Sequence, residues 1–232
     1  VHPDGTRQEF STRLLGHANV QNICGAIAVA HHLGIPLSVL APAVRQLESV
    51  PHRLQLIRQT GLTVIDDAYN SNPAGAKNAL ETLALCRGTR IVITPGLVEL
   101  GEQELDFNRT LGEQAAACCH HLITVGESDR VDAIRSGARE AGLHRDNIHA
   151  AATVQQAMET ARALSGNDKM VLLLNDLTDN YYEYEVVIDK KEIPTPKLEV
   201  NRRGGFVVDE NMKTSIHNIW AGGDAVTGSA TV

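Results

Sequence analysis

The sequence has 232 residues, of which 43% are hydrophobic but only 3% aromatic, and its formal net charge is −7 at pH 7. Nucleic-acid phosphates need clustered Lys and Arg residues, which this acidic chain does not have, so we expect no nucleic-acid partner. No apolar stretch reaches the roughly 20 residues of a membrane span and no signal peptide is recognisable, so we expect a cytoplasmic protein.

The cysteines lack the paired spacings of a disulfide scaffold, so we expect reduced thiols; they are Cys24, Cys86, Cys118 and Cys119. The run from Cys118 to His121 contains the residue types of metal sites. Consecutive residues of a helix, however, point about 100° apart and cannot converge on one ion. We therefore predict no metal site.

The first 50 residues are predicted to contain a pair of helices after a polar start at residues 1–13. The first helix is expected to be capped at Asn19 and to end at Gly34. The second is expected to follow Pro36, because proline is well suited to the first turn of a helix.

Strand and helix patterns alternate between residues 54 and 176. Strands are predicted in two apolar runs around a turn at Gly61, and at 90–94, 121–126, 147–151 and 169–174. Helices are predicted at 73–86, 103–119, 129–141 and 153–164. This alternation predicts an α/β fold, a Rossmann-like and mostly parallel sheet with flanking helices.

Two carboxylates, Asp66 and Asp67, follow directly on the apolar run Val64-Ile65. Open α/β sheets bind ligands at the carboxyl ends of their strands, so these acids are candidate ligand groups. The polar residues 70–72 that follow could instead only form a turn and cap the next helix. Both interpretations stay open.

Three motifs, PHRLQ, VIDDAYNSNPAGAKNALETLAL and ITPGLVELGE, together resemble the C-terminal part of the Mur ligases over residues 14–181. The resemblance is strongest to the branch that adds D-alanyl-D-alanine to the tripeptide precursor. These are three-domain, ATP-dependent amide ligases of peptidoglycan precursor synthesis. The resemblance implies that residues 1–50 end the central, ATP-binding domain and that residues 51–183 form the Rossmann-like C-terminal domain.

The resemblance also implies nucleotide-binding residues. The family motif Gly-x-His-Asn-x-x-Asn keeps its two asparagines here, although Ala18 stands at the histidine position and His17 lies one place earlier. Arg53 would contact phosphate, Asp67 would bind the ribose or adjoining groups, and His52 would lie beside the nucleotide. The implied nucleotide set is Asn19, Asn22, His52, Arg53 and Asp67.

Residues facing the amine substrate are implied at three loops that follow strands, namely Asn70, Asn72, Glu99, Asp176 and Asp179. Glu99 could instead be a solvated residue of a loop that Gly96 and Gly101 allow to turn, and the two aspartates could be simple loop acids. The family often has a histidine shortly after ELGE, where this chain has Asn108. No residue is assigned a catalytic role.

From about residue 184 the pattern changes to strand-like pieces separated by turns, which predicts a small β-rich tail at 184–232. The run TSIHNIWAGGD resembles the second flavin motif of flavin- and NADPH-dependent oxidoreductases of the glutamate synthase small-subunit type. Gly223 and Asp224 would contact the flavin there. The dinucleotide fingerprint Gly-x-Gly-x-x-Gly occurs nowhere in the chain, so we expect no bound FAD.

The sequence also contains no Gly-x-x-x-x-Gly-Lys-Ser/Thr loop to hold phosphates. We therefore expect a C-terminal, nucleotide-closing domain of a ligase that uses ATP with Mg²⁺ and that is inactive alone. Its partners in the full-length enzyme would be a UDP-muramoyl peptide and an amino acid or dipeptide. The alternatives are a non-catalytic binding module and a fragment of a flavin-dependent oxidoreductase.

Overall fold

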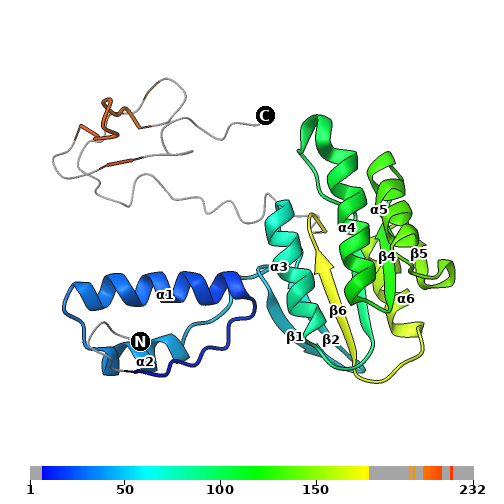
Figure 1. Ribbon diagram of the computed structural model, residues 1–232, viewed down its shortest axis with the longest axis horizontal. Helices are drawn as coiled ribbons and strands as arrows, with labels where there is room; N and C mark the ends of the chain where they lie inside the picture. Colours follow the sequence, from blue (N-terminus) through cyan, green and yellow to red (C-terminus); the bar gives the residue numbers. More distant parts are fainter. Residues whose placement is uncertain (1–6, 178–198, 200, 202–205, 216–219, 222–232) are drawn as a thin grey trace. The chain divides into compact units, whose positions relative to one another are not determined.

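The computed structural model describes residues 7–177, 199, 201, 206–215 and 220–221. The chain divides into two compact units, Val1–Asp179 and Asn180–Val232. The first unit contains a helix pair and a sheet flanked by helices (Figure 1). The three-part division at residues 50 and 183 stays a prediction.

The helix pair consists of α1 (His17–His32) and α2 (Leu37–Arg45). The predicted start of α1 at Asn19 is wrong, because the N-cap is Gly16 and Asn19 lies inside the helix. The Asn19 amide donates to the carbonyl of Leu15 at 2.7 Å. The predicted end is confirmed, since Gly34 has a φ of 89° and follows the last turn, where a left-handed residue commonly ends a helix.

Six strands form one sheet in the order β1-β2-β6-β3-β4-β5. They are β1 (Gln55–Gln59), β2 (Leu62–Asp67), β3 (Arg90–Thr94), β4 (His121–Val125), β5 (Ile148–Ala151) and β6 (Lys169–Leu174). All neighbours are parallel except β1 and β2, because the short turn at Gly61 can join only antiparallel strands. The predicted mostly parallel, Rossmann-like sheet is confirmed.

Helices cover both faces of the sheet, namely α3 (Pro73–Ala84), α4 (Glu104–Cys118), α5 (Asp129–Glu140) and α6 (Val154–Ala163). One buried cluster joins α3, α4 and α5 to the sheet, and a second joins α6 to the opposite face. Two short 3-10 turns, Gly101–Gln103 and Arg145–Asn147, lie in the connections. Among the described residues, no helix has the length and apolar character that crossing a bilayer requires.

Helix starts in the sheet domain agree with the chemistry of the sequence. Asn72, Ser128 and Thr153 each accept a hydrogen bond from a free backbone N–H in the first turn of α3, α5 and α6. Proline at position 73 adds a preset φ to the start of α3. The predicted cap at Thr153 is therefore confirmed, as is the capping interpretation of Asn72.

In the described part of the second unit, two isolated antiparallel bridges join Val208 to Thr214 and Lys213 to Trp220. The predicted β character is present in these residues. The two candidate flavin contacts, Gly223 and Asp224, lie outside the described residues.

Candidate functional site

The strand order brings three loops together at one edge of the sheet. Strand β6 lies between β2 and β3, so the segments that follow these three strands are neighbours at their carboxyl ends. They begin at Ala68, Asn175 and Pro95. Ligands of open α/β sheets bind at this edge, which makes it the first place to look for a site.

A cavity of about 260 Å³ lies where the loop after β2 meets the start of α1. Six of the candidate residues from the sequence line it, together with six further residues. The lining consists of Ala18, Asn19, Asn22, Arg53, Leu54, Asp67, Tyr69, Asn70, Ser71, Asn72, Gly75 and Asn78. The structure thus brings together residues that lie up to 60 positions apart in the sequence.

Arg53 and Asp67 are held beside each other in this cavity by the turn before β1. The guanidinium carbon of Arg53 lies 4.5 Å from the centre of the Tyr69 ring, a cation–π contact. The next residue, Leu54, has a φ of 48° and donates its backbone N–H to Asp67 Oδ1 at 3.0 Å. This bond fixes the carboxylate of Asp67 in the cavity wall.

Burial raises the pKa of Asp67 from 3.8 to about 6. The hydrogen bond from Leu54 and the positive charge of Arg53 oppose this rise, while the negative charge of Asp66 adds to it. Desolvation outweighs the favourable contacts because the side chain is largely enclosed. A further hydrogen-bond donor or positive charge from a ligand would therefore stabilise the ionised form of this carboxylate.

Asp66 and His52 form a separate pair outside the cavity lining. His52 Nδ1 lies 2.8 Å from Asp66 Oδ2, and the other carboxylate oxygen accepts the Ala68 N–H at 3.1 Å. Only 5% of Asp66 is exposed. His52 has a φ of 59°, so this contact also helps to hold a left-handed turn immediately before Arg53. Of the two adjacent acids, only Asp67 therefore lines the cavity.

Asn78 is a cavity residue that the sequence reasoning missed. Its Oδ1 accepts the backbone N–H of Ala18 at 3.2 Å. This hydrogen bond connects the first turn of α1 to α3. A Cβ on Gly16 would lie 2.6 Å from Leu54 Cδ1 and 2.9 Å from Asn78 Nδ2. Asn78 gave no distinct signal in the sequence, because α3 has other polar residues nearby, such as Lys77 and Glu81, and such positions are more often solvated.

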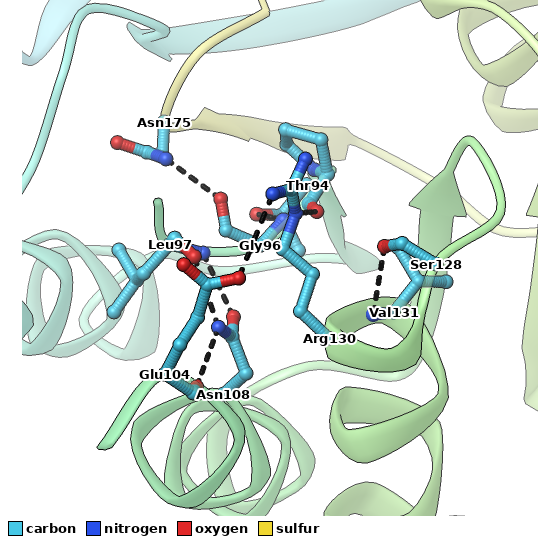
Figure 2. A network of polar contacts seen from close by, with 10 residues as sticks. Thr94, Gly96, Leu97, Glu104, Asn108, Ser128, Arg130, Val131 and Asn175 are labelled. Atoms are coloured by element: carbon cyan, nitrogen blue, oxygen red, sulfur yellow. Dashed lines mark hydrogen bonds and ion pairs between the residues drawn. The ribbon is translucent and has the colours of Figure 1, made fainter. Parts of the chain in front are cut away.

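The loop after β3 is held from three elements (Figure 2). From α4, Asn108 accepts the Leu97 N–H at 2.7 Å and donates to the Leu97 carbonyl at 2.9 Å. From α5, Arg130 donates to the Pro95 carbonyl at 3.2 Å. At the end of β6, Asn175 donates to the Gly96 carbonyl at 2.6 Å. Asn108 is thus a fully buried support of this loop.

The remaining candidates lie outside the cavity lining. Glu99 is exposed and has a φ of 61°, in the supported loop after β3. Asp176 is partly buried at the end of β6, with a φ of 35°. Asp179 lies outside the described residues.

The fold and the cavity define the class of this unit, a Rossmann-like α/β domain with a cavity at the carboxyl edge of its sheet, where such sheets bind ligands. The chain belongs to the Mur ligase family, because the model of the Mur ligase glutamate ligase domain matches residues 52–175, more than half of the chain. Residues 186–232 match the model of pyridine nucleotide-disulphide oxidoreductases.

Curated relatives agree with this assignment. UDP-N-acetylmuramoyl-L-alanine–L-glutamate ligase of Xanthomonas euvesicatoria pv. vesicatoria is 29% identical over 74% of this chain and 35% of its own length. UDP-N-acetylmuramoyl-tripeptide–D-alanyl-D-alanine ligase of Bacillus subtilis is 32% identical over 47% of this chain and 24% of its own length. The chain thus spans about a third or less of the relatives it matches.

Solved structures show the same fold. A crystal structure of MurF from Acinetobacter baumannii is 26% identical, with a TM-score of 0.59 over 71% of this chain and 36% of that chain. MurF ligase from Thermotoga maritima in complex with ADP is 18% identical, with a TM-score of 0.57 over 70% of this chain and 36% of that chain. Together with the family match over residues 52–175, this fold shows that the chain contains the C-terminal domain of a Mur ligase.

Proposed function

We propose that this chain supplies the nucleotide-closing and substrate-binding domain of an ATP-dependent acid–amino-acid ligase of peptidoglycan precursor synthesis. The observation that supports it most is the single cavity that gathers Arg53, Asp67, Asn19 and Asn22. Its volume of about 260 Å³ is slightly below the roughly 300–1,000 Å³ of complete ligand pockets. Such a cavity fits one wall of a nucleotide site, with the phosphate-binding loop on another domain.

The cavity residues have the chemistry that a nucleotide requires. The planar guanidinium of Arg53 can bind two phosphate oxygens at once and stays charged at any cellular pH. The carboxylate of Asp67 can accept hydrogen bonds from ribose hydroxyls, and such donors would offset the cost of its burial. The amides of Asn19 and Asn22 offer both donors and acceptors along the first turns of α1.

ATP would act with Mg²⁺, which prefers oxygen ligands and is commonly held by phosphates and one or two carboxylates. Among the described lining residues, the only carboxylate is that of Asp67. We therefore propose that the phosphates carry most of the metal coordination on this side of the site. MurF ligase from Thermotoga maritima, which has this fold, was solved with ADP.

The proposed reaction joins a carboxylate to an amine. The γ-phosphoryl group of ATP activates the carboxylate of a UDP-muramoyl peptide, and the amine of an amino acid or dipeptide displaces the phosphate, giving amide, ADP and phosphate. The domain would hold the amine beside the nucleotide, because the rate of amide formation depends on holding the two reactants close together and correctly oriented. Asn70, Asn72, Glu99 and Asp176 follow the three strands nearest the cavity and are the proposed contacts for that substrate.

Titration of the ¹⁵N-labelled chain with Mg-ATP, followed by NMR, tests the nucleotide proposal. We expect amide shifts concentrated at Arg53, Leu54, residues 67–72 and the start of α1. Arg53→Ala should weaken ATP binding about tenfold or more without lowering the melting temperature, because it removes charge-assisted hydrogen bonds to phosphate.

Arg58→Ala is the matched control, because Arg58 is an exposed arginine on β1 outside the cavity lining. It should bind ATP like the wild type. Shifts that appear elsewhere, an absence of binding at millimolar ATP, or equal affinity in both variants would each contradict the proposal.

A further inference from the structure

Asn175 stands at the carboxyl end of β6, the strand between β2 and β3. It is fully buried, with 0% of its surface exposed, and its φ is 59°. Asparagine is one of the few residues other than glycine that enter this left-handed region readily. A buried amide needs partners for both its donor and its acceptor, so its hydrogen bonds show what the residue does.

The side chain of Asn175 connects the two neighbouring loops. Its Oδ1 accepts the backbone N–H of Ser71 at 2.6 Å, and its Nδ2 donates to the carbonyl of Gly96 at 2.6 Å, the contact drawn in Figure 2. Its own backbone N–H donates to the carbonyl of Asp67 at 3.0 Å. One residue thus bonds to the end of β2, the loop after β2 and the loop after β3.

The two loops that Asn175 joins have different places in the site. Ser71 lines the cavity together with its neighbours Asn70 and Asn72. Gly96 lies in the loop that carries the exposed Glu99, and the other supports of that loop come from α4 and α5. Among the described contacts, the side-chain bonds of Asn175 are those that join the cavity wall directly to the loop after β3.

We infer that Asn175 is a positioning residue of the ligase site. It fixes the position of the cavity loop that contains Ser71 relative to the loop that carries Glu99. This inference rests on the proposed function, and it adds a residue that contacts neither substrate in the proposal. Asparagine suits the task because one short side chain offers both a donor and an acceptor, which can bond to two different loops. Aspartate has the same shape but has no donor for Gly96.

Variants at position 175 separate the side-chain bonds from the backbone conformation. Asn175→Gly keeps the left-handed backbone at low cost and removes both side-chain bonds. Asn175→Asp keeps the acceptor for Ser71 and loses the donor to Gly96. Asn167→Ala is the matched control, because Asn167 is exposed in the connection before β6, at the opposite end of that strand.

Hydrogen exchange of the full chain, measured residue by residue, is the first readout. In Asn175→Gly we expect the Ser71 amide to exchange on the order of 10–100 times faster, while the strand amides of β3 and β6 keep their protection. In Asn175→Asp, Ser71 should stay protected and the amides of residues 96–100 should exchange faster. Unchanged exchange at Ser71 in Asn175→Gly would overturn the inference.

Mg-ATP affinity is the second readout, which a purely structural role would leave unchanged. We expect about a tenfold higher Kd in Asn175→Gly and no change in Asn167→Ala. Equal affinity of the wild type and Asn175→Gly would overturn the inference and leave the proposed function standing. If the wild type itself bound no ATP, the inference and the proposed function would both be contradicted. Failure of the inference alone can therefore be told apart from failure of the proposed function.

Discussion

Asp66 and Asp67 are adjacent acids with different surroundings, and the alternation of a strand explains the difference. Successive side chains of β2 point to opposite faces of the sheet. Asp66 turns toward His52 and the Ala68 N–H, whereas Asp67 turns toward Leu54 and the cavity. Only one of the two carboxylates can therefore meet a ligand in this cavity.

The raised pKa of Asp67 predicts a pH dependence of stability. Its pKa is about 6 in the folded chain and 3.8 as a free group, so the folded state holds the proton more tightly. This contribution to stability is fully present below 3.8 and is lost as the pH rises through about 6. Relative to Asp67→Asn, the wild type should gain melting temperature as the pH falls from about 7 to about 4.

Glu127→Gln, which changes an exposed acid before α5, is the control for that measurement. The melting temperature of Glu127→Gln should change with pH in the same way as that of the wild type between about pH 4 and about pH 7. If Asp67→Asn also followed the wild type at every pH, Asp67 would not be the group responsible.

Asn72 has a structural role that can be separated from its proposed contact with substrate. Its Oδ1 accepts the Gly75 N–H at 2.8 Å and so caps α3. Asn72→Ala should lower the free energy of unfolding by about 1 kcal/mol, and Asn72→Asp, which keeps a capping oxygen, should lose little. Urea denaturation measures both, and equal losses in the two variants would argue against the cap.

At the scale of elements, the packing of α4 against α5 depends on two glycines. A Cβ on Gly112 of α4 would lie 2.0 Å from the Ile134 carbonyl oxygen, and one on Gly137 of α5 would lie 2.0 Å from the Arg109 carbonyl oxygen. Backbone atoms cannot move aside as side-chain ends do. The two helices therefore approach each other only because both positions lack a side chain.

Gly137→Ala should destabilise the chain by about 1–3 kcal/mol or more, because overpacking forces the backbones of α4 and α5 apart. Gly25→Ala in α1 is the matched control, since a Cβ there meets nothing within 4 Å. It should be neutral or stabilising by about 0.5–1 kcal/mol, the helix preference for alanine. Thermal or chemical unfolding that showed the same effect in both variants would contradict the packing explanation.

At the scale of the whole molecule, the first unit has the parts of an independent domain. Its two buried clusters are built from residues up to Leu177, and the family match ends at residue 175. A chain that ends at Asp179 should unfold cooperatively with a melting temperature within about 2 °C of the full chain. Calorimetry checks this, and the loss of a cooperative transition would show that the first unit needs the rest of the chain.

The sequence by itself determined the order and type of the elements and the family. Apolar periodicity and local caps act over a few residues, so the strands, most helix limits and the cap at Thr153 could be predicted. The motifs around Arg53 and Asp67 also identified side chains that the structure places in one cavity. The start of α1 was predicted wrongly, because Asn19 bonds to the Leu15 carbonyl from inside the helix.

Only the tertiary structure decided which polar residues meet. Strand order places β6 between β2 and β3, and no local pattern encodes that neighbourhood. The bonds of Asn175 join it to Ser71, 104 positions earlier, and to Gly96, 79 positions earlier. Contacts at such separations depend on how the whole sheet assembles, which is why Asn78 and Asn175 could not be singled out from their own surroundings in the chain.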